Sequence, residues 1–175
     1  FMWPASWWMR YEYWIRRAAG LGEAPKGADP DRYEKNHAHC DVLIVGSGPA
    51  GLSAALAAGQ TGARVILTEE QDSFGGSLTY NTDCTIDGAP AFEWAERTVA
   101  ALSSMPEVIL LKATVTTGYY DHNYLTLLET TDNDNQTGSE YKTRQRLWKV
   151  RAKRVVLATG QIERPLIFRD NDRPG

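Results

Sequence analysis

The chain has 175 residues, a formal net charge of -3 at pH 7, 42% hydrophobic residues and two cysteines. This length gives one domain with a sizeable core, and the scattered Lys and Arg residues exclude a binding surface for nucleic acid. No apolar run is long enough to cross a bilayer, and Cys40 and Cys84 form no C-x-x-C pair, which excludes a dithiol redox centre.

Residues 1–38 are expected to form an aromatic-rich segment followed by a linker. Aromatic rings crowd its beginning, at Trp3, Trp7, Trp8, Tyr11, Tyr13 and Trp14. One or two helical turns are expected before Gly20-Leu21-Gly22, and we expect the rings to pack on another domain or a partner rather than to stack on nucleic-acid bases. The segment lacks the layout of a signal peptide. Two distant cysteines make a disulfide scaffold unexpected, so a reducing cytoplasm is the default location. Residues 24–38, rich in Pro, Gly and charge, are the expected linker.

A dinucleotide-binding domain is expected over residues 39–175. Residues 42–45 form an apolar, β-branched run that is typical of a parallel strand buried on both faces. A Gly46-x-Gly48-x-x-Gly51 turn, a helix over residues 49–59 and a second strand over residues 64–68 follow it. This order of strand, glycine turn, helix and strand is the context in which the glycine pattern indicates a dinucleotide site.

Each glycine of the turn has a physical role in such a site. Gly46 allows the tight turn, Gly48 lets a pyrophosphate approach the backbone, and Gly51 lets the helix pack on the sheet. Pro49 suits the first turn of the helix, and the helix N-terminus from Ala50 onward offers N–H groups to the phosphates.

Two acidic residues end the second strand. Glu69 or Glu70 is expected to accept hydrogen bonds from the adenosine ribose, and a carboxylate there repels a 2′-phosphate, which favours NAD or FAD over NADP. The alternative is an α/β domain that needs tight turns and binds nothing.

The segment after the acidic pair contains Gly75-Gly76-Ser77. Its backbone is expected to cover the cofactor, with an ordinary flexible loop as the alternative. A helix is expected over residues 91–105. Strands over residues 108–117, 119–130 and 141–150 form an antiparallel meander at about 108–151, with a polar turn over residues 131–140.

No residue is assigned to catalysis or to a metal. His122 is expected at an exposed turn. His37, His39 and Cys40 cannot all reach one ion, because alternate side chains of a strand point to opposite faces.

A last buried strand, residues 154–159 followed by Gly160, is expected to rejoin the parallel sheet beside the first strand. The predicted fold is therefore α/β: a Rossmann-like FAD/NAD(P)-binding domain of the three-layer ββα type with a β-meander insertion and an incomplete sheet.

Three motifs carry a resemblance to known proteins. They are Val45-Gly46-Ser47-Gly48-Pro49-Ala50-Gly51 with the acid-ended strand, Phe74-Gly75-Gly76-Ser77, and Val155-Val156-Leu157-Ala158-Thr159-Gly160. In this order they resemble the flavoproteins with two dinucleotide-binding domains. The flanking stretches, among them His39-Cys40-Asp41, Gln161-Ile162-Glu163-Arg164-Pro165 and Asn171-Asp172-Arg173-Pro174-Gly175, resemble the alpha subunit of heterotetrameric sarcosine oxidase.

The resemblance implies an internal part of a longer alpha subunit, with beta, gamma and delta subunits and the remainder of the alpha chain as partners. Such a complex oxidatively demethylates sarcosine to glycine and hydrogen peroxide and passes the one-carbon unit to tetrahydrofolate. FAD is implied on the beta subunit, FMN at the alpha–beta interface and NAD in the site of this chain. An open alternative is an amine, opine or proline dehydrogenase, or another flavoprotein oxidoreductase, that holds FAD in the same site.

The implied NAD contacts fall on the glycine turn for the phosphates, on residues 69–71 for the ribose and on Val115 for the adenine. The expected site residues are Gly46, Gly48, Pro49, Ala50, Gly51, Glu69, Glu70, Gln71, Gly76, Ser77, Val115 and Gly160.

Overall fold

The computed structural model describes residues 3–22, 27, 31–81, 83–131 and 143–161. The chain divides into two compact units, Phe1–Pro30 and Asp31–Gly175. Among the described residues, no helix combines the length and the apolar character needed to span a membrane.

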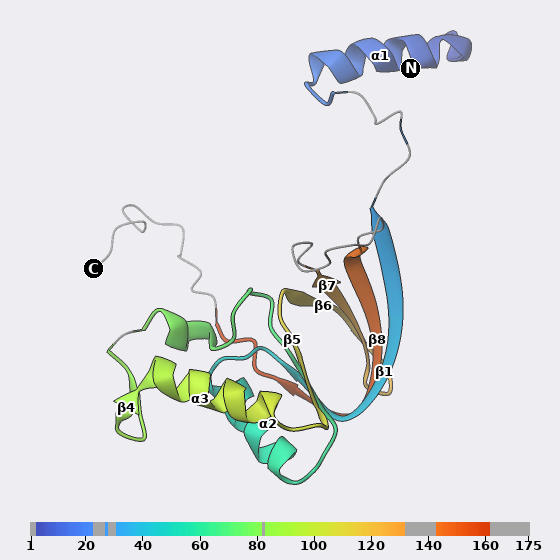
Figure 1. Cartoon of the computed structure of the whole chain (residues 1–175). Coiled ribbons are helices and arrows are strands. Elements are labelled where there is room, and N and C mark those ends of the chain that lie inside the picture. Colours follow the sequence, from blue (N-terminus) through green and yellow to red (C-terminus); the bar gives the residue numbers. More distant parts are fainter. Residues whose placement is uncertain (1–2, 23–26, 28–30, 82, 132–142, 162–175) are drawn as a thin grey trace. The chain divides into compact units, whose positions relative to one another are not determined.

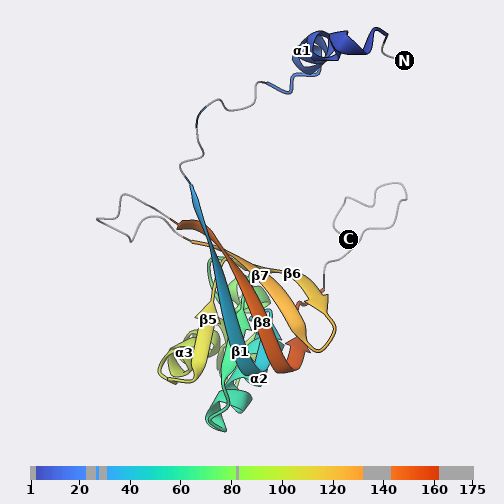
Figure 2. The same cartoon turned by 90° about the vertical axis from the view of Figure 1, so that its right-hand side faces the viewer.

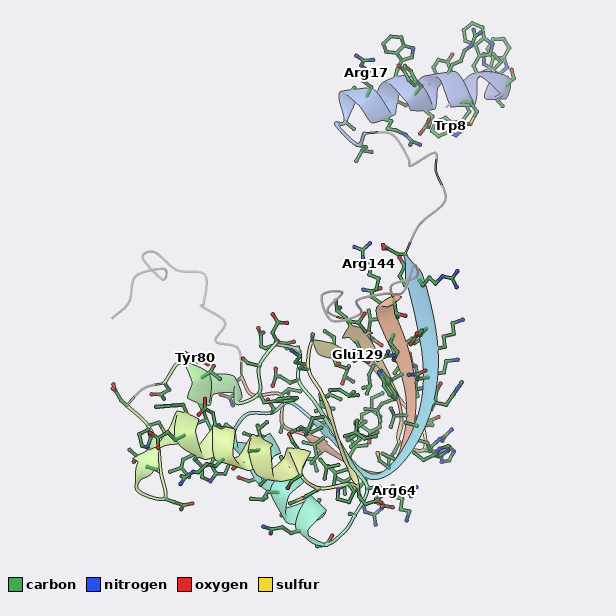
Figure 3. All side chains as sticks on the ribbon, in the orientation of Figure 1. Trp8, Arg17, Arg64, Tyr80, Glu129 and Arg144 are labelled. Atoms are coloured by element: carbon green, nitrogen blue, oxygen red, sulfur yellow. The ribbon has the colours of Figure 1, made fainter. Side chains whose placement is uncertain are left out.

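The first unit consists of a short 3₁₀ turn, η1 (Ala5–Trp7), and the helix α1 (Trp8–Ala18). Arg16 pairs with Glu12 one turn earlier along α1, and Figure 3 shows Trp8 and Arg17 on this helix. The expected helical turns before Gly20 are thus confirmed. No residue of α1 is buried, and the Trp14 side chain is 67% exposed.

The second unit is built on a six-stranded mixed sheet with the order β5-β2-β1-β8-β7-β6 (Figures 1 and 2). The strands are β1 (Arg32–Val45), β2 (Val65–Thr68), β5 (Val108–Leu111), β6 (Thr114–Tyr120), β7 (Tyr124–Thr130) and β8 (Thr143–Leu157). β5, β2, β1 and β8 run parallel, whereas β7 runs antiparallel to both β8 and β6. A small hairpin pairs β3 (Thr85–Ile86) with β4 (Ala89–Pro90).

Two core layers lie on the two faces of the parallel strands. The helices α2 (Pro49–Gln60) and α3 (Ala91–Ser103) lie on one face (Figure 1), where Ile44 and Leu67 pack against them. Leu43 and Ile66 point to the other face and pack with side chains of β7 and β8. This alternation explains why all four residues of β2 are buried. The expected three layers of helices, parallel sheet and meander are confirmed.

β1 is longer than the sequence indicated. It begins at Arg32, so residues 32–38 form a strand rather than the expected linker. Their partner is the first half of β8: the Glu34 carboxylate accepts hydrogen bonds from Thr143 Oγ1 at 2.7 Å and Arg146 Nε at 2.8 Å. The polar composition of this stretch therefore belongs to an exposed strand with cross-strand ion pairs.

β8 is also longer than expected, because it joins the two strands predicted over residues 141–150 and 154–159. The first part of β8 lies between β1 and β7 and pairs with both. The second part, from Arg154 to Leu157, pairs with β1 alone among the described strands. Leu157 is 61% exposed on this open edge. The sheet is not closed, as the sequence predicted.

The strand predicted over residues 108–117 is divided in two, and the prediction that all of it belongs to the antiparallel meander is wrong: β5 pairs in parallel with β2, and only β6 pairs antiparallel with β7. Ala113 has a φ of +47° and separates β5 from β6. The expected turn near His122 is confirmed: His122 and Asn123 have φ values of +60° and +52°, which suits a tight hairpin between β6 and β7. Residues 132–140 of the expected polar turn lie outside the described residues.

Candidate functional site

The turn between β1 and α2 has no room for side chains at two of its glycines. Gly46 has a φ of +96°, and a Cβ added there would lie 2.3 Å from the carbonyl oxygen of Ala158. A Cβ added at Gly51 would lie 1.9 Å from the carbonyl oxygen of Gly46. These two glycines therefore let the turn pack directly against the end of β8 and the first turn of α2.

Gly48 differs from both. Its φ is -63°, and a Cβ added there would meet no protein atom within 4 Å. Gly48 is also the N-cap of α2, where it contributes no side-chain oxygen to the helix N-terminus. The turn therefore leaves open space beside the N–H groups of the first helical turn, which is the feature that a phosphate requires.

A buried carboxylate lies at the end of β2, next to this turn. Glu69 is 6% exposed. Its Oε2 accepts hydrogen bonds from Ser47 N at 2.9 Å and from Ser47 Oγ at 2.6 Å, and its Oε1 accepts one from Gln71 N at 3.1 Å. Glu70 is exposed, and its carboxylate lies 3.5 Å from Gln71 Nε2. The geometry thus separates the two acids that the sequence left as alternatives.

Ser47 joins the glycine turn to the loop that follows β2. It is fully buried, and its Oγ accepts a hydrogen bond from Gly75 N at 3.0 Å. The next residue, Gly76, begins the 3₁₀ turn η2 (Gly76–Thr79), and a Cβ added there would lie 3.0 Å from Gly48 Cα. The Gly-Gly loop therefore lies against the glycine turn. Sequence reasoning missed Ser47, because a residue between two motif glycines gave no signal other than its hydroxyl group.

The remaining expected site residues lie at the same edge of the sheet. Ala113 N donates to Gln71 O at 2.9 Å, which brings the start of β6, and with it Val115, next to the end of β2. Val115 is 47% exposed. Ala158 N donates to Val45 O at 2.8 Å, so Gly160 follows β8 beside the glycine turn. All of these residues gather at the carboxyl ends of the parallel strands, where open α/β sheets bind ligands.

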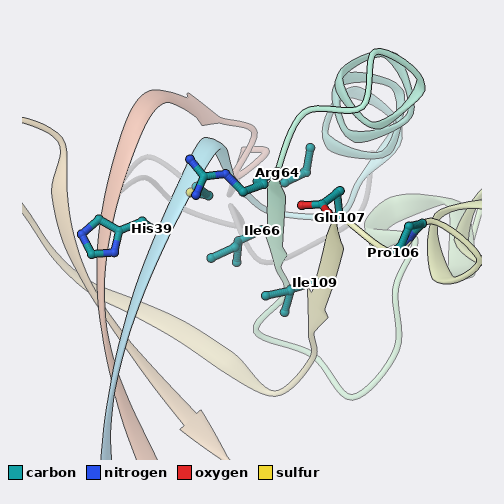
Figure 4. A pocket seen from close by; sticks show the side chains of 8 residues that line it. His39, Arg64, Ile66, Pro106, Glu107 and Ile109 are labelled. Atoms are coloured by element: carbon teal, nitrogen blue, oxygen red, sulfur yellow. The ribbon is translucent and has the colours of Figure 1, made fainter.

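A second set of polar residues lies where β2 and β5 begin, beside the interior of β1. A pocket there is lined by His39, Cys40, Arg64 and Glu107, together with apolar residues (Figure 4). Hydrogen bonds from Arg64 and Lys153 hold the pKa of Asp41, which neighbours this pocket, well below its usual range. Burial raises the pKa of the Cys40 thiol to about 11.

This pocket is separate from the glycine turn. Within the described part of the chain, no group of three or more His, Cys, Asp or Glu side chains is arranged to hold a metal ion.

Comparisons with known proteins agree with the glycine pattern of residues 46–51 and the acid-ended strand that follows it. Residues 41–109 match a family model described as FAD dependent oxidoreductase. Over its whole length the chain is 50% identical to the sarcosine oxidase subunit alpha of Rhizobium meliloti (strain 1021), and over 89% of its length it is 45% identical to that of Corynebacterium sp. (strain P-1). The chain is a homologue of one segment of the sarcosine oxidase alpha subunit. It spans 18% and 16% of the length of these two relatives.

Solved structures show the same fold. L-proline dehydrogenase from P. horikoshii is 26% identical, with a TM-score of 0.59 over 87% of this chain and 28% of that chain. Thioredoxin reductase from Lactococcus lactis is 20% identical, with a TM-score of 0.52 over 76% of this chain and 39% of that chain. The Rossmann-like fold of FAD-dependent oxidoreductases, predicted from the sequence, is confirmed.

Proposed function

We propose that this chain binds the ADP part of an adenine dinucleotide at the carboxyl ends of β1 and β2. One observation carries the proposal: a buried carboxylate, Glu69, is fixed by hydrogen bonds beside a glycine turn that leaves space at Gly48. In this arrangement the pyrophosphate lies over Gly48 and the N-terminus of α2, and Glu69 accepts hydrogen bonds from the ribose hydroxyls.

The residues present fit this ligand in two respects. The open space at Gly48 lies beside helix N–H groups that carry a partial positive charge, which suits the phosphates. An ionised carboxylate has about four acceptor positions, and the described protein groups use three of those on Glu69. Oε1 therefore retains capacity for a ribose hydroxyl, whereas a 2′-phosphate at the same place would meet a like charge.

We propose NAD as the dinucleotide. Support comes from the similarity to sarcosine oxidase alpha subunits, because the family resemblance implies NAD in this site. FAD is the second candidate, favoured by the match of residues 41–109 to an FAD dependent oxidoreductase model. Either group supplies redox chemistry through its nicotinamide or flavin ring, while the residues of this chain bind and orient its ADP part.

We further propose that the chain acts within a sarcosine oxidase of alpha, beta, gamma and delta subunits. In that assembly sarcosine is oxidised to glycine with release of hydrogen peroxide, and the one-carbon unit passes to tetrahydrofolate. FAD on the beta subunit carries out the amine oxidation, FMN lies at the alpha–beta interface, and the complex is cytoplasmic. The exposed aromatic rings of α1 pack on other parts of this assembly.

The test compares Glu69→Gln with Glu70→Gln in the complete subunit. Loss of a hydrogen bond to a charged group costs about 1.5–3 kcal/mol, so Glu69→Gln is expected to weaken ADP binding about 10- to 100-fold. Glu70→Gln makes the same chemical change at an exposed neighbour and is expected to leave binding within about twofold. Isothermal titration calorimetry measures both, and circular dichroism verifies folding. Unchanged ADP affinity in folded Glu69→Gln would contradict the proposal.

A further inference from the structure

We infer that Ser47 is a positioning residue of this site, which sets the carboxylate of Glu69 for the ribose and couples it to the Gly-Gly loop. The inference rests on the proposed nucleotide binding and adds to it a residue outside the glycine fingerprint. Ser47 touches no ligand atom in this account. It acts through its hydrogen bonds to Glu69 and Gly75.

The directions of these hydrogen bonds follow from the groups involved. An ionised carboxylate only accepts, and a backbone N–H only donates. The Ser47 hydroxyl therefore donates to Glu69 Oε2 at 2.6 Å and accepts from Gly75 N at 3.0 Å. The hydroxyl has one proton, which it donates to Glu69. The hydrogen bonds therefore run from Gly75 N to Ser47 Oγ and from Ser47 Oγ to Glu69 Oε2. Because Ser47 is fully buried, no solvent competes for either bond.

This chain determines which carboxylate oxygen faces the ligand. Both the amide and the hydroxyl of Ser47 bind Oε2, whereas Oε1 accepts only from Gln71 N among the described groups. Oε1 is therefore the oxygen that remains for the ribose. Without the hydroxyl, the carboxylate would keep only two backbone donors, Ser47 N on Oε2 and Gln71 N on Oε1, and its orientation toward the ribose would be fixed less firmly.

The same hydroxyl holds the loop that follows β2. Gly75 N binds Ser47 Oγ, and the adjoining Gly76 lies so close to the glycine turn that a Cβ on it would be 3.0 Å from Gly48 Cα. The loop is anchored further on by the buried Leu78. A ribose hydroxyl bound at Oε1 would fix the orientation of the carboxylate to which Ser47 Oγ donates, and through this hydroxyl it would steady the loop beside the phosphates. Ribose recognition and loop order become coupled through one side chain.

The test compares the affinities of ADP and 2′-deoxy-ADP for the complete subunit within its multi-subunit complex. Ser47→Ala removes the hydroxyl with little change in volume, and Ser53→Ala makes the same change on the exposed side of α2. Wild type and Ser53→Ala are expected to bind ADP about tenfold more tightly than 2′-deoxy-ADP. In Ser47→Ala this preference is expected to fall to about threefold or less. A merely structural defect would weaken both probes equally and leave their ratio unchanged.

Retention of the full ribose preference in Ser47→Ala would overturn the inference. Failure of the wild type to bind either probe is a different result, because it removes the proposed nucleotide site and with it the inference. A second measurement needs no variant: in wild type, ADP is expected to slow hydrogen exchange of residues 74–79 more than 2′-deoxy-ADP does at equal saturation. Equal slowing by the two probes would overturn the coupling.

Discussion

Replacement of Gly48 by alanine is expected to weaken ADP binding while leaving the free energy of unfolding nearly unchanged. The backbone at Gly48 is accessible to alanine, and the new Cβ meets no protein atom within 4 Å. Alanine lowers the conformational entropy of the unfolded chain, which stabilises the protein by about 0.4–1 kcal/mol. Alanine is also a poorer N-cap than glycine, and this opposing effect costs about the same. The free energy of unfolding is therefore expected to change by less than about 1 kcal/mol.

The effect of Gly48→Ala on binding is expected to be much larger. The methyl group would occupy the space that we propose for the pyrophosphate, and each hydrogen bond to a charged group is worth about 1.5–3 kcal/mol. Loss of one such bond weakens ADP binding about 10- to 100-fold. Titration calorimetry measures the affinity, and urea unfolding measures the stability of the same preparation.

Gly51→Ala is the matched control for Gly48→Ala. Its Cβ would lie 1.9 Å from the carbonyl oxygen of Gly46, so α2 must move away from the turn. Overpacking of this kind costs about 1–3 kcal/mol or more. Two results would refute the reasoning: wild-type ADP affinity in Gly48→Ala, or a loss of stability in Gly48→Ala that equals the loss in Gly51→Ala.

Three further predictions concern parts of the fold outside the glycine turn. Because hydrogen bonds from Arg64 lower the pKa of Asp41, Asp41→Asn should destabilise the protein at pH 7, and its difference from wild type in urea melts should shrink as the pH falls below about 4; a pH-independent difference would contradict this. Iodoacetamide at pH 8 should modify the half-exposed Cys84 well before Cys40, whose pKa is about 11, and mass spectrometry that finds Cys40 modified first would refute it. Trp148→Phe removes the 2.6 Å hydrogen bond that Nε1 donates to the Glu129 carboxylate and should lower the free energy of unfolding by about 1.5–3 kcal/mol. An unchanged urea midpoint would exclude a contribution from this bond.

The sequence predicted the unit of strand, glycine turn and helix well because its signals are local. The strand before Gly46, the helix after Pro49 and the hairpin turn at His122 each depend on residues within a few positions. The polar strand over residues 32–38 was missed for the opposite reason. Its stability depends on pairing with residues more than 100 positions away, such as the contacts of Glu34 with Arg146 and Thr143, and composition alone resembled a linker.

The site itself was only partly predictable. Two adjacent acids end β2, and no local rule in the fingerprint chose between them. Burial and three hydrogen bonds identify Glu69 as the fixed carboxylate and leave Glu70 exposed. The contact between Ser47 and Gly75 was not predictable, since it joins a turn to a loop that lies 28 positions further along the chain. Side-chain direction at the end of a strand therefore required the structure.

The most direct test of the account is to identify the nucleotide released by denaturation from the complete alpha subunit, by mass spectrometry and absorbance. The account predicts NAD, retained by the wild type and lost from Gly48→Ala. FAD lost in the same way would contradict the NAD assignment and favour the flavin as the ligand of this site. A subunit that releases no adenine nucleotide and takes up neither NAD nor FAD would contradict the central claim that Gly48 and Glu69 form a dinucleotide site.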